Sequence, residues 1–289
     1  MKIAIVTDSN SGITQSQAKE MGIHVVPMPV LIDGDQYFED LTLSQEQFYE
    51  KLKDDKVSVS TSQPSAFDVG ELWTDILKDY DKIIHIPMSS GLSETCRTLT
   101  HLAETDFKDK VYVIDNQRIS ITMRQSVVDA LNMVKEGKTA EEIRDWLMAT
   151  KMQSSIYIMV GTLKYLKKGG RLTPAVAAIG TLLKIKPVLQ IQGFKLDQFA
   201  KVRKIADAKT TMMNAIDSDL KNRFADLRAN GKLNLAVAHT ENFEEAKIFA
   251  EELEGRFPDL KVEFIDPLSL SVSCHIGPGA LACAVAIKY

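Results

Sequence analysis

The chain has 289 residues, of which 45% are hydrophobic and 26% are charged, and its formal net charge at pH 7 is -4. This length is enough for about two domains of ordinary size. The composition excludes a disordered, collagen-like or coiled-coil chain, and the net charge argues against a dedicated nucleic-acid binder.

The first half of the chain alternates short apolar runs with amphipathic segments. Strands are predicted at residues 3–7, 24–32, 82–88 and 111–115, and helices at 14–21, 65–80, 93–104 and 120–136. Such alternation is typical of a parallel, doubly wound α/β sheet. A further helix over 139–151 starts with the capping-box pair Thr139 and Glu142. We therefore expect residues 1–152 to form an N-terminal α/β domain.

The second half has a different pattern. Strands are predicted at 156–161, 186–192, 233–239 and 261–265, and helices at 206–230 and 243–256. Gly193 and Phe194 lie before strand-like residues 196–202, which predicts a hairpin and some antiparallel pairing. Residues 153–289 are expected to form a C-terminal α/β domain with a mixed sheet and helices. No Pro-rich or Ser-rich linker marks the boundary, so we expect the two domains to pack closely and share a cleft.

Two features bear on where the protein works. Residues 267–287 contain no Asp, Glu, Lys or Arg and are about long enough to span a bilayer, but Gly277, Pro278 and Gly279 would break a lipid-facing helix. A buried strand-turn-strand or strand-turn-helix is expected instead. The cysteines, Cys96, Cys274 and Cys283, form no CxxC pair, so neither a disulfide framework nor a zinc site is predicted. A cytoplasmic location fits best.

The familiar catalytic signatures are absent from the sequence. There is no GxxxxGK[ST], GxGxxG after a strand, HExxH or GxSxG motif, and the histidines show no metal-ligand spacing. Three polar clusters remain, each at a predicted strand end or helix start, where open α/β sheets gather ligands. They are residues 60–65, 87–95 and 275–280.

In the first cluster, Thr61 and Ser62 come just before a helix that Pro64 and Ser65 begin, and ordinary capping also explains it. In the second, several serines and Gly91 open a helix, so unpaired backbone N–H groups and the helix dipole predict an anion site. Glu94 disfavours a highly charged phosphate there, and a carboxylate or a neutral carbonyl suits the site better.

The third cluster places His275 beside a glycine turn, which lets the backbone approach a ligand closely, although a lone histidine is more often structural.

The chain resembles the DegV family of bacterial fatty-acid-binding proteins over most of its length. The resemblance is carried by Thr7-Asp8-Ser9, Thr61-Ser62-Gln63-Pro64-Ser65, Ser89-Ser90-Gly91-Leu92-Ser93, Gly169-Gly170-Arg171 and His275-Ile276-Gly277-Pro278-Gly279-Ala280. One departure is Glu94, where the family usually has Gly. An acidic side chain there could alter the head-group pocket or the access of a partner.

The resemblance implies two α/β domains that hold one long-chain fatty acid in a tunnel between them, with no cofactor and no catalysis by the protein itself. Members of the fatty acid kinase binding-subunit type present the acyl carboxylate to an ATP-binding kinase subunit, which makes acyl phosphate for phospholipid synthesis. By this resemblance, Thr61 and Ser93 would bind the carboxylate, with Ser62 and His275 close by. The supporting backbone would come from Gly91, Gly277 and Gly279.

The charge distribution is uneven along the chain. Residues 164–209 contain eleven Lys or Arg and two Asp, a net charge of +9 that leaves -13 for the remainder. This segment is either a solvated face or a surface that docks an acidic kinase subunit or, transiently, anionic lipid heads. Arg171 and Arg203 are the expected docking residues. Nucleic acid is disfavoured, because no recognised module and few stacking aromatic residues are present.

Two other functions stay open. An acyl hydrolase could use Ser93 as nucleophile and His275 as base, although Ser93 lacks the GxSxG elbow and no third triad member is evident. A small-molecule or phosphosugar transferase on a related α/β scaffold is disfavoured by the missing phosphate loop. We therefore expect a carrier that is not an enzyme.

Overall fold

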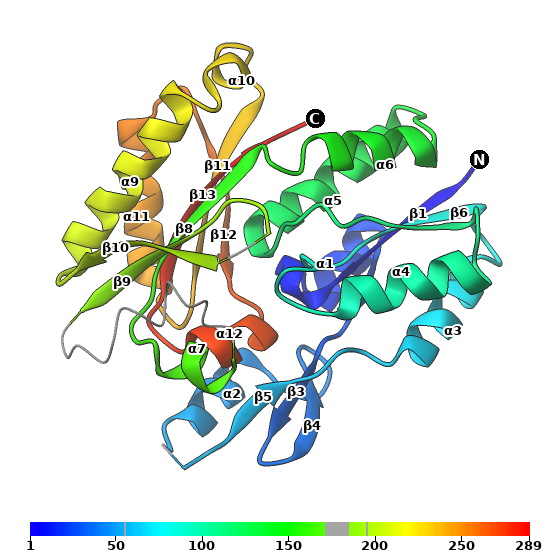
Figure 1. Cartoon of the computed structure of the whole chain (residues 1–289), viewed down its shortest axis with the longest axis horizontal. Coiled ribbons are helices and arrows are strands. Elements are labelled where there is room, and N and C mark those ends of the chain that lie inside the picture. The colour runs from blue at the N-terminus through cyan, green and yellow to red at the C-terminus, as the bar shows by residue number, and fades with distance from the viewer. Residues whose placement is uncertain (55, 171–184, 195) are drawn as a thin grey trace. The chain divides into compact units, whose positions relative to one another are not determined.

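The computed structural model describes residues 1–54, 56–170, 185–194 and 196–289. The chain divides into two compact units (Figure 1). The first unit is Met1–Met152 together with Tyr289, and the second unit is Gln153–Lys288. The sequence predicted that Tyr289 would belong with the second half. Instead its backbone N–H donates to Asp129 Oδ1 at 2.9 Å and its ring lies edge-on to Trp146.

A four-stranded parallel sheet forms the centre of the first unit. Its order is β2-β1-β6-β7, from β1 (Ile3–Asp8), β2 (His24–Val26), β6 (Lys82–Ile86) and β7 (Val111–Val113). The accompanying helices are η1 (Ser9–Ser11), α1 (Gln15–Met21), α3 (Ala66–Ile76), α4 (Thr95–Asp106), α5 (Ser120–Lys135) and α6 (Ala140–Ala149). The predicted parallel α/β sheet is confirmed.

The core of the first unit explains why its strands are apolar on both faces. Ala4 and Val6 pack with Trp73 of α3 and Leu99 of α4. The intervening residues Ile3 and Ile5 are also buried, and α5 packs against the same strand. Helices on both faces give a parallel strand no polar side, so these strands appear in the sequence as continuous apolar runs.

The predicted strand over 24–32 is wrong as a single element. It is β2 followed by β3 (Pro29–Ile32), which belongs to a separate antiparallel sheet with β4 (Asp35–Phe38) and β5 (Val59–Thr61) in the order β4-β3-β5. Pro27 separates the two strands and cannot donate to a strand ladder. Asp33 and Gly34 both have positive φ, as a tight hairpin requires. Helix α2 (Gln45–Leu52), also unpredicted, lies before β5.

The second unit contains a mixed sheet, as predicted, and this sheet has six strands. Its order is β10-β9-β8-β13-β11-β12, from β8 (Ser154–Met159), β9 (Lys186–Ile191), β10 (Leu196–Val202), β11 (Leu233–His239), β12 (Val262–Pro267) and β13 (Leu281–Ile287). Only the β11–β12 pair is parallel among these. The predicted hairpin is β9 and β10. Helices α9 (Ile205–Lys221) and α11 (Phe243–Arg256) pack on the sheet through Met212, Ile216 and Phe249.

Two segments of the second unit differ from the predicted elements. The long helix expected over 206–230 is α9 followed by α10 (Ala225–Ala229). Asn222 ends α9, where its side chain donates to the Ser218 carbonyl at 2.8 Å, and buried Phe224 then turns into the core. The uncharged stretch after β12 forms α12 (Leu270–Ile276), a glycine turn and the fully buried β13, so the order is helix, turn and strand. None of the helices described is both long and apolar enough to cross a bilayer.

Candidate functional site

The strand order of the first unit brings three sequence-distant polar segments to one edge of its sheet. Strand β2 lies on one side of β1 and β6 lies on the other, so the order reverses between β1 and β6. Asp8 ends β1, Ser89 follows β6 and Asp115 follows β7. Ligands of open α/β sheets bind at the carboxyl ends of strands where the order reverses. The loop of residues 87–94, called the serine loop below, lies at that position.

The buried carboxylate of Asp8 fixes the start of the serine loop. Its Oδ2 accepts the Met88 N–H at 2.8 Å and its Oδ1 accepts the Asn10 N–H at 2.9 Å. Burial raises the pKa of Asp8 to about 6, although the hydrogen bonds from Met88 and Asn10 act in the opposite direction. Sequence reasoning included Asp8 only as part of a family motif and missed its role in holding the loop.

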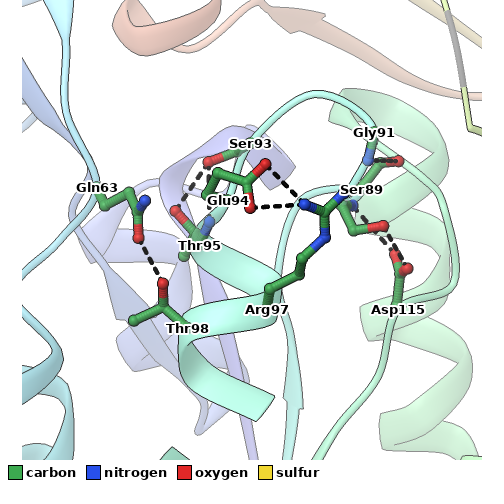
Figure 2. Close-up of polar contacts among 10 residues, drawn as sticks. Gln63, Ser89, Gly91, Ser93, Glu94, Thr95, Arg97, Thr98 and Asp115 are labelled. Carbon is green, nitrogen blue, oxygen red and sulfur yellow. Dashed lines mark hydrogen bonds and ion pairs between the residues drawn. The ribbon is translucent and has the colours of Figure 1, made fainter. Parts of the chain in front are cut away.

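A second carboxylate, Asp115, fixes the middle of the serine loop. Its Oδ1 accepts the Ser90 N–H at 3.1 Å and its Oδ2 accepts the Ser90 hydroxyl at 2.6 Å. The Ser89 N–H donates to the Arg118 carbonyl at 3.0 Å. The carboxylates of Asp8 and Asp115, at the ends of the two strands that flank β6, therefore hold the loop that follows β6. Figure 2 shows the contact of Asp115.

The remaining amide N–H groups of the serine loop donate hydrogen bonds to Ser89. The Ser89 carbonyl accepts the Leu92 and Ser93 N–H groups at 3.0 and 3.2 Å, and the Ser89 hydroxyl accepts the Gly91 N–H at 3.2 Å. Every amide from Met88 to Ser93 thus donates within the protein. The prediction of an anion site built from unpaired N–H groups is wrong for these residues. Hydroxyl groups are the donors that the loop can offer a ligand.

Ser93 stands where the serine loop meets α4. Its Oγ lies 2.9 Å from Thr95 Oγ1 and accepts the Thr95 N–H at 3.2 Å. Ser93 is half-buried, whereas Thr95 is buried. The two contacts fix the position of the Ser93 hydroxyl beside the first turn of the helix.

The charge of Glu94 is paired on the outer surface of α4. Both of its carboxylate oxygens accept hydrogen bonds from Arg97 Nη1, at 2.9 and 2.8 Å, and both side chains are exposed (Figure 2). The sequence raised the question of whether this unusual acidic residue alters the head-group site. In the structure an adjacent cation on the same helix offsets its charge.

The segment of Thr61 and Ser62 reaches the same helix. Thr61 ends β5 and is half-buried, while Ser62 is exposed and donates its N–H to the Pro29 carbonyl at 3.4 Å. Gln63 Oε1 accepts the Thr98 hydroxyl at 2.9 Å, one turn into α4 from Thr95. Two of the three predicted clusters therefore meet at the start of α4 (Figure 2).

The third cluster lies in the second unit and packs on helix α7 (Lys164–Lys168). A Cβ atom at Gly169 would lie 2.0 Å from His275 Nδ1, so the imidazole occupies the space that a side chain would need. Gly277 has a φ of 75°, and a Cβ there would lie 2.3 Å from Tyr165 Cδ2. Gly277 requires glycine on both counts, its positive φ and its contact with Tyr165, whereas a side chain at Gly169 would have to displace the imidazole. Two of the family motifs, at residues 169–170 and 275–280, are thus in direct contact.

Thr240, which sequence reasoning missed, closes the turn after His275. Its hydroxyl donates to the Gly277 carbonyl at 2.7 Å and accepts the Ala280 N–H at 2.8 Å. Its carbonyl accepts the Gly279 N–H at 2.8 Å. Thr240 follows β11 directly, and a hydroxyl at a strand end was the available signal.

Not every cation of the basic segment at residues 164–209 contributes charge to the surface. Arg203 and its neighbours Lys201 and Lys204 are exposed. The buried Lys209 ammonium, in contrast, lies 2.8 Å from a Glu245 oxygen and 2.6 Å from a Glu252 oxygen, so it adds no free surface charge. Arg171 lies outside the described residues.

The three thiols and the acidic side chains do not form a reactive or metal-binding centre in the part of the chain that the structure describes. Cys96, Cys274 and Cys283 are buried, and burial raises the pKa of Cys96 to about 12, with the negative charge of Asp115 acting in the same direction. Thiols with such a raised pKa are poor nucleophiles. Among the described residues, no three His, Cys, Asp or Glu side chains are grouped to hold a metal ion.

Comparison with known proteins extends the sequence resemblance. Residues 2–288 match the family model described as "Uncharacterised protein, DegV family". Protein DegV of Bacillus subtilis is 31% identical over 283 residues, which cover 97% of this chain and 98% of that protein. A DegV domain-containing protein of Listeria innocua is 30% identical over 290 residues and 99% of both chains.

Solved structures have the same fold. The crystal structure of DegV from Bacillus subtilis, described as a fatty acid binding protein, aligns with a TM-score of 0.86 and 30% identity over the full length of both chains. A fatty-acid-binding DegV family protein from Thermus thermophilus aligns with a TM-score of 0.88 and 25% identity over 99% of this chain and 100% of its own. With a family model and relatives that match nearly its whole length, this chain belongs to the DegV family.

Proposed function

We propose that this protein binds one long-chain fatty acid and holds its carboxylate with hydroxyl groups at the start of α4. The observation that carries the proposal is the convergence of Ser93 and the Thr61–Gln63 segment on that helix, in a chain whose relatives of known structure bind fatty acids. Thr61 and Ser93 are the proposed carboxylate donors, with Ser62 beside them. His275 of the second unit is a further proposed contact.

The chemistry of the head group supports hydroxyl donors. Burying a chain of about sixteen carbons contributes about 0.8 kcal/mol per methylene, or about 10 kcal/mol before ordering costs are subtracted. The carboxylate therefore needs orientation more than affinity. Hydroxyl groups orient it without the bidentate grip of an arginine, which leaves an oxygen accessible for phosphoryl transfer.

The finer proposal is that the protein presents this carboxylate to an ATP-binding fatty acid kinase subunit in the cytoplasm. The exposed cations Lys201, Arg203 and Lys204 support a docking role, because a solvent-exposed basic surface attracts an acidic partner. We propose that Arg171 also contacts the acidic partner. The protein supplies no catalysis and no cofactor in this scheme.

Charge reversal tests the kinase proposal. Arg203→Glu should lower acyl phosphate formation with the kinase subunit while palmitate binding stays normal, since the arginine is assigned to docking alone. Lys232→Glu, at another exposed cation outside the basic segment, is the matched control and should leave turnover unchanged. Equal loss of turnover in both variants would contradict a docking role for Arg203.

The rival function is an acyl hydrolase that uses Ser93 as nucleophile. Such a serine needs a base within hydrogen-bond reach, and the Ser93 contacts that fix its hydroxyl come from Thr95, whose hydroxyl and amide are not bases. Labelling of Ser93 by a fluorophosphonate probe would favour the hydrolase. Release of an intact fatty acid on denaturation would favour the carrier.

A further inference from the structure

We propose that Thr95 directs the hydroxyl proton of Ser93 outward, which makes Ser93 a dedicated hydrogen-bond donor to the ligand. The inference rests on the proposed fatty-acid binding and names a positioning residue for that site. Thr95 is the first residue of α4 and acts through Ser93 (Figure 2).

Burial determines the direction of the hydrogen bond between the two hydroxyls. The 2.9 Å contact between Ser93 Oγ and Thr95 Oγ1 allows either atom to donate. If Ser93 donated, the proton of Thr95, a side chain only 1% exposed, would have no other acceptor among the described residues. An unsatisfied buried donor is costly, so the Thr95 hydroxyl donates to Ser93.

With the bond in that direction, the Ser93 hydroxyl can act toward a ligand only as a hydrogen-bond donor. A serine hydroxyl has one proton and two acceptor lone pairs. Thr95 fills both lone pairs of Ser93 Oγ, one with its hydroxyl and one with its backbone N–H at 3.2 Å. The proton of Ser93 is then its only free hydrogen-bonding group, and it lies on the half-buried member of the pair.

A group that can only donate selects ligands that accept. An ionised carboxylate is acceptor-only, and hydrogen bonds to a charged group are stronger than those between neutral groups. The position also lies at the amino end of a twelve-residue helix, where negative charge is favoured. Thr95 therefore matches Ser93 to a carboxylate head group by fixing where its proton points.

A double-mutant cycle tests this role with palmitate as the probe. Thr95→Val keeps the side-chain shape but removes the hydroxyl, and should weaken palmitate binding about fivefold to tenfold, the usual effect of losing the net contribution of one hydrogen bond. Thr95→Ser should restore the affinity to within about twofold, because its hydroxyl can donate in the same way. In a Ser93→Ala background, Thr95→Val should cause no further loss, since Thr95 acts only through Ser93.

Thr100→Val is the matched control on the same helix. Its hydroxyl donates to the Cys96 carbonyl at 2.8 Å and does not take part in the site, so palmitate affinity should not change. Equal weakening by Thr95→Val with and without the Ser93 hydroxyl, or no rescue by Thr95→Ser, would overturn the inference. Absence of palmitate binding by the unmodified protein would instead contradict the proposed function, and the inference with it.

Discussion

The serine loop of the first unit and the glycine turn at 277–279 of the second unit are held in place by different physical means. Carboxylates, a hydroxyl and backbone carbonyls accept the amide N–H groups of the serine loop, with Asp8 and Asp115 at Met88 and Ser90. The glycine turn is also hydrogen-bonded, through Thr240, but it is constrained in addition by close packing, because Tyr165 occupies the space beside Gly277. Protonation of a carboxylate or an isosteric substitution should therefore change the stability of the serine loop. An added methyl group should destabilise the glycine turn.

The largest expected effect is at the glycine turn. Gly277→Ala adds a methyl group 2.3 Å from the Tyr165 ring at a φ of 75°, so we expect a loss of about 3 kcal/mol in the free energy of unfolding from strain and overpacking together. Thermal unfolding followed by circular dichroism measures it. Gly279 also has a positive φ, but no atom lies within 4 Å of a Cβ built there. Gly279→Ala should therefore lower the free energy of unfolding by less than Gly277→Ala does.

Gly255→Ala provides the control for that comparison. It lies in α11 without a positive φ, and no atom lies within 4 Å of a Cβ built there, so alanine should be neutral or slightly stabilising. A Gly277→Ala protein as stable as Gly255→Ala would show that packing does not hold the turn.

The pH dependence of the first unit comes next in size. The folded pKa of Asp8, about 6, is above its ordinary value of 3.8, so the folded state holds the proton more tightly than the unfolded chain. The contribution of Asp8 to stability is therefore greatest below about pH 4 and is lost as the pH rises through 6. The shift corresponds to about 3 kcal/mol as an upper value.

Asp8→Asn removes this titration. Both tryptophans, Trp73 and Trp146, belong to the first unit, so urea unfolding followed by tryptophan fluorescence reports on it. Between pH 4 and 7 the stability of the unmodified protein should fall relative to that of Asp8→Asn. A difference between the two proteins that stays constant over this range would mean that Asp8 is ionised throughout.

A smaller effect is expected from the hydroxyl groups themselves. Ser93→Ala and Thr61→Ala should each weaken palmitate binding by about tenfold, because one hydrogen bond contributes about 1 to 2 kcal/mol against the larger contribution of the acyl chain. Isothermal titration calorimetry measures the affinities. Unchanged binding and unchanged phosphorylation in both variants would remove the serine loop from the head-group site.

The smallest expected effect concerns Glu94. Glu94→Gly introduces the residue usual in the family and removes an exposed ion pair with Arg97, which contributes little to stability. Palmitate affinity should stay within about twofold, since an adjacent cation already offsets the carboxylate. A rise of more than fivefold in affinity would show that the Glu94 charge reaches the bound head group.

Periodicity predicted the two principal sheets because both bury strands over their full length, as with β1 and the central β13. It merged β3 with β2 across Pro27 and missed β4 and β5, which are only four and three residues long. It also extended one helix through Asn222, because apolar spacing continues to Phe224 although the chain turns there.

The residue types of the candidate site could be predicted from the sequence, but their hydrogen-bond partners could not. Ser93 and Thr61 were identified from motifs, whereas the partners of the loop amides come from Asp8 and Asp115, far away in sequence. Whether an amide is already satisfied depends on such tertiary contacts. For the same reason the sequence counted Lys209 as a surface charge, although two glutamates of α11 pair with it.

The central claim is that the protein carries a fatty acid and does not transform it. The most direct measurement is mass spectrometry of the purified protein, first under native conditions and then after denaturation. We expect one intact long-chain fatty acid per chain, bound in the native protein and released without covalent attachment on denaturation. A protein without lipid after exposure to palmitate, or an acyl group covalently attached to Ser93, would contradict the claim.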